Sequence, residues 1–165
     1  MTVLSVDLDP GALTLTIVSE FDASAERVWQ VWADPRTLER WWGPPNFPAT
    51  VIDHDLTPGG RVTYFMTGPD GEEHHGWWRV TAVDRPHSLA FEDGFADTHG
   101  QPDGDLPTTS VEVRLSSQGA KTTMTIVSRF GSIADMERII ATGTDEGMAL
   151  AVGQIDALLA APAAP

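Results

Sequence analysis

The segment from Asp34 to Pro44 constrains the fold more than any other part of this chain. Asp34 is a residue type that caps helices, because its carboxylate accepts hydrogen bonds from the free N–H groups of the first turn. Pro35 suits the first helical position, where its missing N–H costs nothing. Gly43 is expected to take the left-handed backbone that closes a helix, and Pro44 prevents the helix from continuing. The segment therefore predicts a short helix that ends at a rigid corner.

Two tryptophans, Trp41 and Trp42, lie at the end of this helix, which we expect at residues 35–42. Their indoles place a large apolar area at a fixed point of the chain, where it can wall a core or a pocket. We interpret the pair first as core anchors. Trp41 is also a ligand-binding candidate, because the side chains that build a core line any pocket within it.

Composition excludes several classes of function. The 165 residues include 10 basic and 24 acidic side chains, which give a net charge of −14, and there is no cysteine. Such an anion is repelled by phosphate backbones and acidic lipid surfaces, so we expect no nucleic-acid or membrane partner. Disulfides and thiolate sites are excluded. The start lacks a secretory signal pattern and no apolar stretch is long enough to span a bilayer, so a cytoplasmic location is expected.

The pattern of apolar residues predicts the secondary structure. Period-two alternation and turn residues predict strands at 12–21, 49–56, 61–67, 73–84, 88–93, 109–117 and 121–130. Ser24 is expected to cap a first helix, and Ser132 to open a final helical region that Gly143 interrupts. From residue 144 the apolar positions form one stripe at helical spacing. The segment 94–107, rich in Gly, Pro and Asp, is expected to form a mobile loop or a wide hairpin, and the sequence does not say whether it is a lid.

This order of elements predicts an α+β fold. We expect a curved antiparallel sheet of six to seven strands wrapped around a long C-terminal helix, with two short helices after the first strand. A single domain over 1–165 is expected, with its core at about 12–160. One helix cannot fill the concave side of such a sheet, so a cavity between helix and sheet is predicted.

The chain resembles the helix-grip fold of the START-like (SRPBCC) superfamily and, within it, the family named for the activator of heat-shock protein ATPase. The resemblance covers residues 13–160 and is carried by Phe21-Asp22-Ala23-Ser24 with Val28-Trp29, by Trp41-Trp42-Gly43-Pro44, by Asp55-Leu56-Thr57-Pro58-Gly59-Gly60-Arg61, and by Glu146-Gly147-Met148. It implies a deep, largely apolar pocket gripped by the last helix. It does not imply one reaction, since members include lipid carriers, hormone receptors, polyketide cyclases and chaperone activators. Many relatives carry Trp where this chain has Met148, so a softer or wider pocket wall is expected.

Two polar residues are candidates for orienting a ligand or for catalysis. His54 shares a strand face with Ile52 and Leu56, which predicts that the imidazole faces inward. There it would be a pocket base or hydrogen-bonding group, or a core histidine satisfied by the backbone. Tyr64, the only tyrosine, would donate to a ligand or reach solvent at the rim.

The remaining candidates are apolar. Trp77 and Trp78 must face opposite sides of a regular strand, and the sequence does not say which faces inward. The predicted ligand-binding set is Trp41, His54, Tyr64, Met66, Trp78, Phe91, Met124, Ile126, Met148 and Val152.

Metal and covalent chemistry find no support in the sequence. Asp53, His54 and Asp55 alternate across a strand, so they cannot hold one ion together. No HExxH pattern, nucleophile elbow or P-loop occurs. Asp97, Asp103 and Asp105 are read as a solvated acidic loop rather than a calcium site. We therefore expect neither a metal nor a cofactor.

Three functions remain as hypotheses. The first is a protein that binds a small hydrophobic molecule, oriented by His54 and Tyr64. The second is an enzyme that uses the same cavity for cyclisation, dehydration or hydrolysis with His54 as base. The third is a chaperone-interacting protein. A homodimer is left open as an assembly.

Overall fold

The computed structural model describes residues 3–160. The strands are β1 (Val3–Asp9), β2 (Thr14–Phe21), β3 (Ala49–His54), β4 (Arg61–Thr67), β5 (Glu73–Asp84), β6 (Ser88–Phe95), β7 (Thr109–Gln118) and β8 (Lys121–Arg129). The helices are α1 (Ala25–Ala33), α2 (Pro35–Leu38), α3 (Ile133–Ala141), α4 (Thr144–Val152) and α5 (Ile155–Ala160). None of the helices within residues 3–160 is long and apolar enough to cross a membrane.

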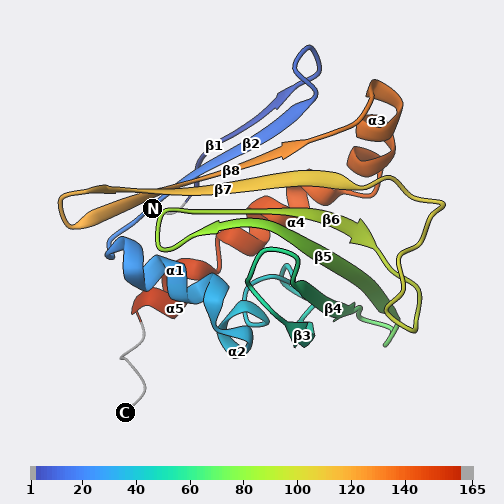
Figure 1. Cartoon of the computed structure of the whole chain (residues 1–165), viewed down its shortest axis with the longest axis horizontal. Helices are drawn as coiled ribbons and strands as arrows, with labels where there is room; N and C mark the ends of the chain where they lie inside the picture. The colour runs from blue at the N-terminus through green and yellow to red at the C-terminus, as the bar shows by residue number, and fades with distance from the viewer. Residues whose placement is uncertain (1–2, 161–165) are drawn as a thin grey trace.

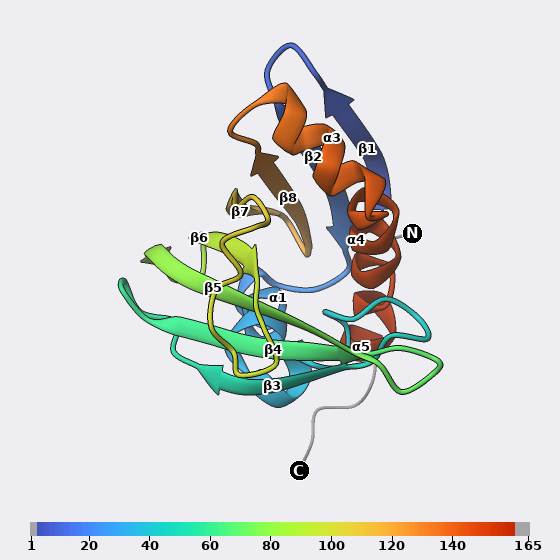
Figure 2. The same ribbon diagram turned by 90° about the vertical axis from the view of Figure 1, so that its right-hand side faces the viewer.

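All strands join one antiparallel sheet in the order β1-β2-β8-β7-β6-β5-β4-β3 (Figure 1). The sheet bends strongly, so that the β1–β2 end and the β4–β3 end lie on opposite sides of its concave face (Figure 2). α1 packs near β7 and β8, whereas α4 packs near β1 and β2. The α+β class and the curved sheet with a C-terminal helix match the expectation from the sequence.

The sheet has eight strands rather than six to seven. The additional strand is β1, which pairs with β2 as the edge of the sheet. Its apolar residues alternate but remain exposed: Leu4 is 53% exposed, Val6 47% and Leu8 38%. The sequence predicted no strand before residue 12, because the apolar residues of an uncovered edge strand add little to a core.

The helices that follow β2 begin as the sequence predicts. The Ser24 hydroxyl accepts a hydrogen bond from the Arg27 N–H, and the Asp34 carboxylate accepts one from the Arg36 N–H. α2 is shorter than expected and ends at Leu38, with turns continuing to Trp42. Gly43 does not take the predicted left-handed backbone. Glycine is needed there because a Cβ would overlap the carbonyl oxygen of Phe47.

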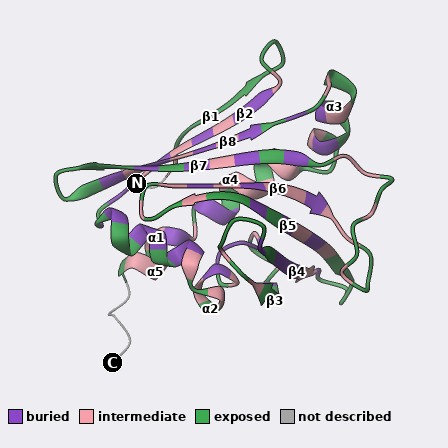
Figure 3. Cartoon of the chain, in the orientation of Figure 1, coloured by how far each residue is buried: buried purple, intermediate pink, exposed green. Residues whose placement is uncertain are grey.

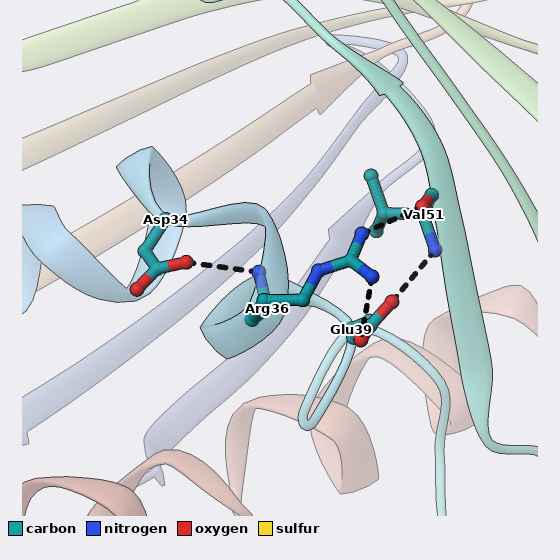
Figure 4. A network of polar contacts seen from close by, with 4 residues as sticks. All are labelled: Asp34, Arg36, Glu39 and Val51. Carbon is teal, nitrogen blue, oxygen red and sulfur yellow. Dashed lines mark hydrogen bonds and ion pairs between the residues drawn. The ribbon is translucent and has the colours of Figure 1, made fainter.

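α2 is tied to the open edge of β3 by a polar network (Figure 4). The Arg36 guanidinium donates to the Val51 carbonyl at 2.9 Å, and the Val51 N–H donates to the Glu39 carboxylate at 3.0 Å. Arg36 and Glu39 also form an ion pair at 3.5 Å. These side chains use the backbone groups that an edge strand would otherwise offer to another chain.

The C-terminal helical region consists of consecutive pieces. Gly143, with a φ of 82°, separates α3 from α4, as the sequence predicts. A turn at Gly153 and Gln154 then separates α4 from α5, so the expected long helix is divided. Hydrogen bonding continues through this turn, because the Gly153 N–H donates to the Ala149 carbonyl at 3.0 Å.

Figure 3 marks the buried residues along the chain in purple. Their side chains form two hydrophobic clusters. The large cluster joins α1, the turn with Trp41, Trp42 and Gly43 that we call the corner after α2, the inner faces of β3 to β8, and the end of α4. The small cluster consists of Leu15, Phe130, Met136 and Ile139 beneath α3. Phe95 and Ile140 pack against the small cluster.

The corner after α2 should depend on Gly43. Because a Cβ would overlap Phe47, we expect Gly43→Ala to lower the free energy of unfolding by about 2–4 kcal/mol. Gly104→Ala is the matched control, since a Cβ there has no neighbour within 4 Å, and it should change stability by less than about 0.5 kcal/mol. Urea denaturation followed by tryptophan fluorescence measures both. Equal stability of the two variants would contradict this account of the corner.

Candidate functional site

A β-bulge in β3 decides the orientation of His54. The register with β4 shifts between Val51 and Asp53, which turns Ile52 to the outer side, where it is 58% exposed. The prediction that Ile52 shares an inner face with His54 was wrong, because a bulge adds one residue and breaks the alternation. His54 Nε2 lies 2.9 Å from the Trp32 carbonyl oxygen. The geometry is therefore that of the core histidine satisfied by the backbone.

Aromatic side chains fill the concave side of the sheet near α1. Trp32 packs edge-on against Trp41, with ring centroids 4.7 Å apart, and Trp42 packs edge-on against Trp78 at 4.8 Å. Trp78 stacks on Phe91 at 4.1 Å. The sequence did not say which of Trp77 and Trp78 faces inward. In the structure it is Trp78, which is 0% exposed.

Two shallow hollows stand out on the surface of residues 3–160. One of about 390 Å³ is beside the corner after α2 and includes Gly43, Pro45 and Gln154 in its lining. The other, of about 240 Å³, lies by β4 and the loop after β6 and includes His75 and His99. None of the predicted ligand-binding residues lines either hollow.

Four polar residues lie on the inner face of the sheet, one of them, Tyr64, within the large cluster and the others where the two clusters meet. We call Tyr64, Asp93, Thr109 and Ser128 the polar strip. Asp93 lies opposite Thr109 in the register of β6 and β7. Ser128 lies on β8, diagonally across from Thr109. Tyr64, Thr109 and Ser128 are buried, and Asp93 is half-buried.

The polar strip marks the boundary between the clusters on two separate strands. On β6, Phe91 belongs to the large cluster and Phe95 packs against the small one, with Asp93 between them on the same face. The β8 segment repeats the pattern, because Ser128 lies between Ile126 of the large cluster and Phe130 of the small one. The core is thus interrupted by groups that can form hydrogen bonds.

Tyr64 and Asp93 form the centre of the polar strip. The Tyr64 hydroxyl donates to the Asp93 carboxylate at 3.2 Å. Gly76 faces Tyr64 across β4 and β5, and a Cβ there would overlap the phenol, so glycine makes room for the ring. Burial raises the pKa of Asp93 from 3.8 to about 7, against the opposing effect of the Tyr64 and Gly94 hydrogen bonds. Burial also raises the pKa of Tyr64 well above its usual range, and the Asp93 charge adds to this shift.

Two indole N–H groups beside this pair lack a partner. Trp42 Nε1 and Trp78 Nε1 are buried and form no hydrogen bond. Both rings lie close to Tyr64, with centroids 5.9 Å and 6.3 Å from its ring. The pKa of Tyr64 is lowered by both indoles, in opposition to burial. The site therefore combines a phenol, a carboxyl group and two buried indole donors.

The other predicted site residues are divided between core and periphery. The structure places Trp41, Trp78, Phe91, Met124, Ile126 and Val152 in the large cluster as buried residues, with Met66 and Met148 packed against it. Met124 accepts the Trp32 indole N–H at its sulfur, 3.4 Å away. His54 and Tyr64 do not form a pair, because each has a different hydrogen-bond partner.

Sequence reasoning missed Asp93, Thr109, Ser128 and the role of Trp42. The sequence does contain a signal for Asp93. Its strand was predicted to end at residue 93, and Asp93 follows Leu89 and Phe91 at every second position, so all three face the same side. Following that alternation would have placed a carboxyl group on the inner face.

Metal ligation finds no support within residues 3–160, where no group of three His, Asp or Glu side chains could hold an ion. The acidic loop side chains act locally instead. The Asp97 carboxylate accepts from the N–H groups of His99 and Gln101, and the Asp103 carboxylate accepts from the Asp105 N–H.

Similar structures have been solved. Protein Ms6760 from Mycobacterium smegmatis is 50% identical, with a TM-score of 0.90 and coverage of 98% of this chain and 99% of that one. A protein from Arthrobacter aurescens, solved by NMR, is 51% identical, with a TM-score of 0.93 and coverage of 98% and 94%. A protein from Rhodobacter sphaeroides is 22% identical, with a TM-score of 0.83 and coverage of 98% and 100%, and shows the fold alone. No curated protein matches the chain.

The family model described as "Activator of Hsp90 ATPase homolog 1-like protein" matches residues 22–160. The match includes the corner after α2, the polar strip and the C-terminal helices. This chain therefore belongs to the Activator of Hsp90 ATPase homolog 1-like family, within the START-like (SRPBCC) superfamily that its sequence resembles.

Proposed function

We propose that this protein binds a small, neutral, largely apolar molecule between the polar strip and the junction of α3 and α4. The observation that carries this proposal is the interruption of the core by Tyr64, Asp93, Thr109 and Ser128. Buried polar groups cost stability unless they are satisfied, and the indole N–H groups of Trp42 and Trp78 beside the polar strip have no partner. This arrangement favours a binding role over a purely structural one. The family commonly binds hydrophobic ligands, which supports the same function.

The segment that joins α3 to α4 is suited to move. Ile139 of α3 belongs to the small cluster and Ala151 of α4 to the large one, so the chain between them passes from one cluster to the other. Gly143 breaks the helix within this passage, and Thr144, Gly147 and Met148 are only half-buried. An apolar molecule enters when this segment shifts outward, with Gly143 as the hinge.

Electrostatics favour a neutral molecule. The chain has a net charge of −14, which repels anions. The Asp93 carboxyl adds a local reason, because its pKa of about 7 shows that a negative charge at this position is already unfavourable. A second carboxylate bound beside it would raise the cost further.

The two other hypotheses stay predictions. An enzyme with His54 as base would need the imidazole nitrogen that lies 2.9 Å from the Trp32 carbonyl. A chaperone-interacting role and a homodimer are likewise untested.

Binding is tested with N-phenyl-1-naphthylamine, a neutral apolar fluorophore. We expect saturable binding at one site per chain. Met148→Trp adds a large ring where Met148 packs against the large cluster, and should weaken binding about tenfold. Leu150→Trp is the matched control on the same helix, since Leu150 is 58% exposed, and should leave affinity unchanged. Fluorescence titration measures all three proteins. No saturable binding by the wild type, or equal affinity of the two variants, would contradict the proposed site.

The Asp93 carboxyl predicts a pH dependence of stability. Its folded-state pKa of about 7 lies above the ordinary 3.8, so between these values the folded chain binds more protons than the unfolded chain. The stabilisation that the protonated Asp93 carboxyl gives the folded chain is therefore fully present below pH 4 and is lost as the pH rises toward 7. Asp93→Asn removes this loss. We expect the variant to gain roughly 1–3 kcal/mol relative to the wild type between pH 4 and pH 8.

Urea denaturation at a series of pH values measures this difference. Asp84→Asn is the control, because Asp84 is exposed at the end of β5, and its difference from the wild type should stay constant with pH. A constant difference for Asp93→Asn as well would show that the carboxyl is solvated as in the unfolded chain.

A further inference from the structure

We infer that the bound molecule carries an oxygen acceptor, such as a ketone, ester or amide carbonyl, that accepts hydrogen bonds from the indole N–H groups of Trp42 and Trp78. The inference rests on the proposed ligand-binding function and names the chemical class of the ligand. It follows from three properties of these indoles: their burial, their missing partners and their convergence on one point.

Burial makes the missing partners costly. Trp42 is 4% exposed and Trp78 is 0% exposed, and neither Nε1 atom has a hydrogen-bond partner. A buried donor left without an acceptor carries a desolvation penalty that a solvated donor does not. Such groups are rare in folded proteins, and each calls for a cause.

Other tryptophans of the same chain show that unpaired indoles are not a general property of this fold. The Trp32 N–H donates to the Met124 sulfur at 3.4 Å, and the Trp41 N–H donates to the Val31 carbonyl at 2.8 Å. On the outer face, the Trp77 N–H donates to the Phe95 carbonyl at 3.0 Å. Among the buried indole N–H groups within residues 3–160, those without a partner belong to Trp42 and Trp78, which both lie beside the Tyr64–Asp93 pair.

The two indoles converge on the Tyr64 hydroxyl. Their rings meet edge to face with centroids 4.8 Å apart, and their centroids lie 5.9 Å and 6.3 Å from that of the Tyr64 ring. The Tyr64 O–H itself is directed to Asp93. An oxygen atom placed beside the phenol would therefore be within reach of both indoles.

The donor set selects the chemistry of the ligand. An indole N–H can only donate, so its partner must be an acceptor, which excludes an ammonium group at this point. The nearby Asp93 carboxyl disfavours a second carboxylate. A neutral carbonyl oxygen remains, because it accepts two hydrogen bonds and brings no charge into the apolar surroundings.

The test compares two probes of matched shape, 2-acetylnaphthalene and 2-isopropenylnaphthalene, which differ in having C=O or C=CH₂. We expect the ketone to bind the full-length protein about tenfold more tightly or better, because the alkene leaves both indole donors unpaired. In ¹H–¹⁵N spectra of indole-labelled protein, the ketone should move the Nε1–H signals of Trp42 and Trp78 downfield, and the alkene should not.

Single substitutions assign these signals and test the donors. Trp42→Phe and Trp78→Phe each keep an aromatic ring and remove the N–H, so each should reduce the preference for the ketone to about threefold or less. Trp77→Phe is the control, because its N–H is paired on the outer face, and it should keep the full preference. If Trp78→Phe does not fold, Trp42→Phe and the wild-type spectra still decide.

The outcomes separate the inference from the function it rests on. If neither probe binds, the proposed function fails. If both probes bind with equal affinity and the two indole signals do not respond to the ketone, the protein binds apolar molecules but the carbonyl inference is overturned. A water molecule that satisfies the indoles in the complex would give this second result.

Discussion

The contact of Trp32 with its aromatic neighbours is the interaction on which the rest of the structure depends. Its ring lies within 4.7 to 6.4 Å of Trp41, Trp42, Trp78 and Phe91, measured between centroids. These rings come from α1, the corner after α2, β5 and β6, so one cluster joins the helices to the sheet. The Trp32 N–H donates a hydrogen bond to the Met124 sulfur on β8, which extends the connection across the sheet. Such aromatic pairs add stability beyond the area that they bury.

The same cluster positions the candidate site. Trp42 and Trp78 are held by their packing, which places their unpaired N–H groups beside Tyr64. Packing that was optimised only for stability would satisfy these donors or replace them with apolar groups. On the proposed function, a ligand that satisfies these donors returns part of the stability that they cost. Gly143, the proposed hinge, lies where the chain passes from one hydrophobic cluster to the other.

Much of the fold could be predicted from the sequence, because strand alternation and helix caps are local signals. The strands from residue 61 to residue 130 lie close to their expected positions, and Ser24, Asp34 and Ser132 cap helices as expected. The candidate site was predicted only in part. Tyr64 and Trp78 belong to it, whereas His54 is bound to a backbone carbonyl and Asp93 was missed. The bulge at Ile52 has no clear local signature, because it depends on how β3 pairs with β4.

The sequence by itself determined the α+β class, the antiparallel sheet, the family and the acidic character that disfavours nucleic acid and membranes as partners. Those properties depend on residue types and their spacing along the chain. Only the tertiary structure decided which of Trp77 and Trp78 faces inward, that aromatic side chains fill the concave side, and that Asp93 lies beside Tyr64. Each of these depends on contacts between residues far apart in the sequence, where the space left by one side chain determines the position of another. The chemistry of the site arises from those contacts, because a carboxyl group and two indoles become unusual only when burial removes water from them.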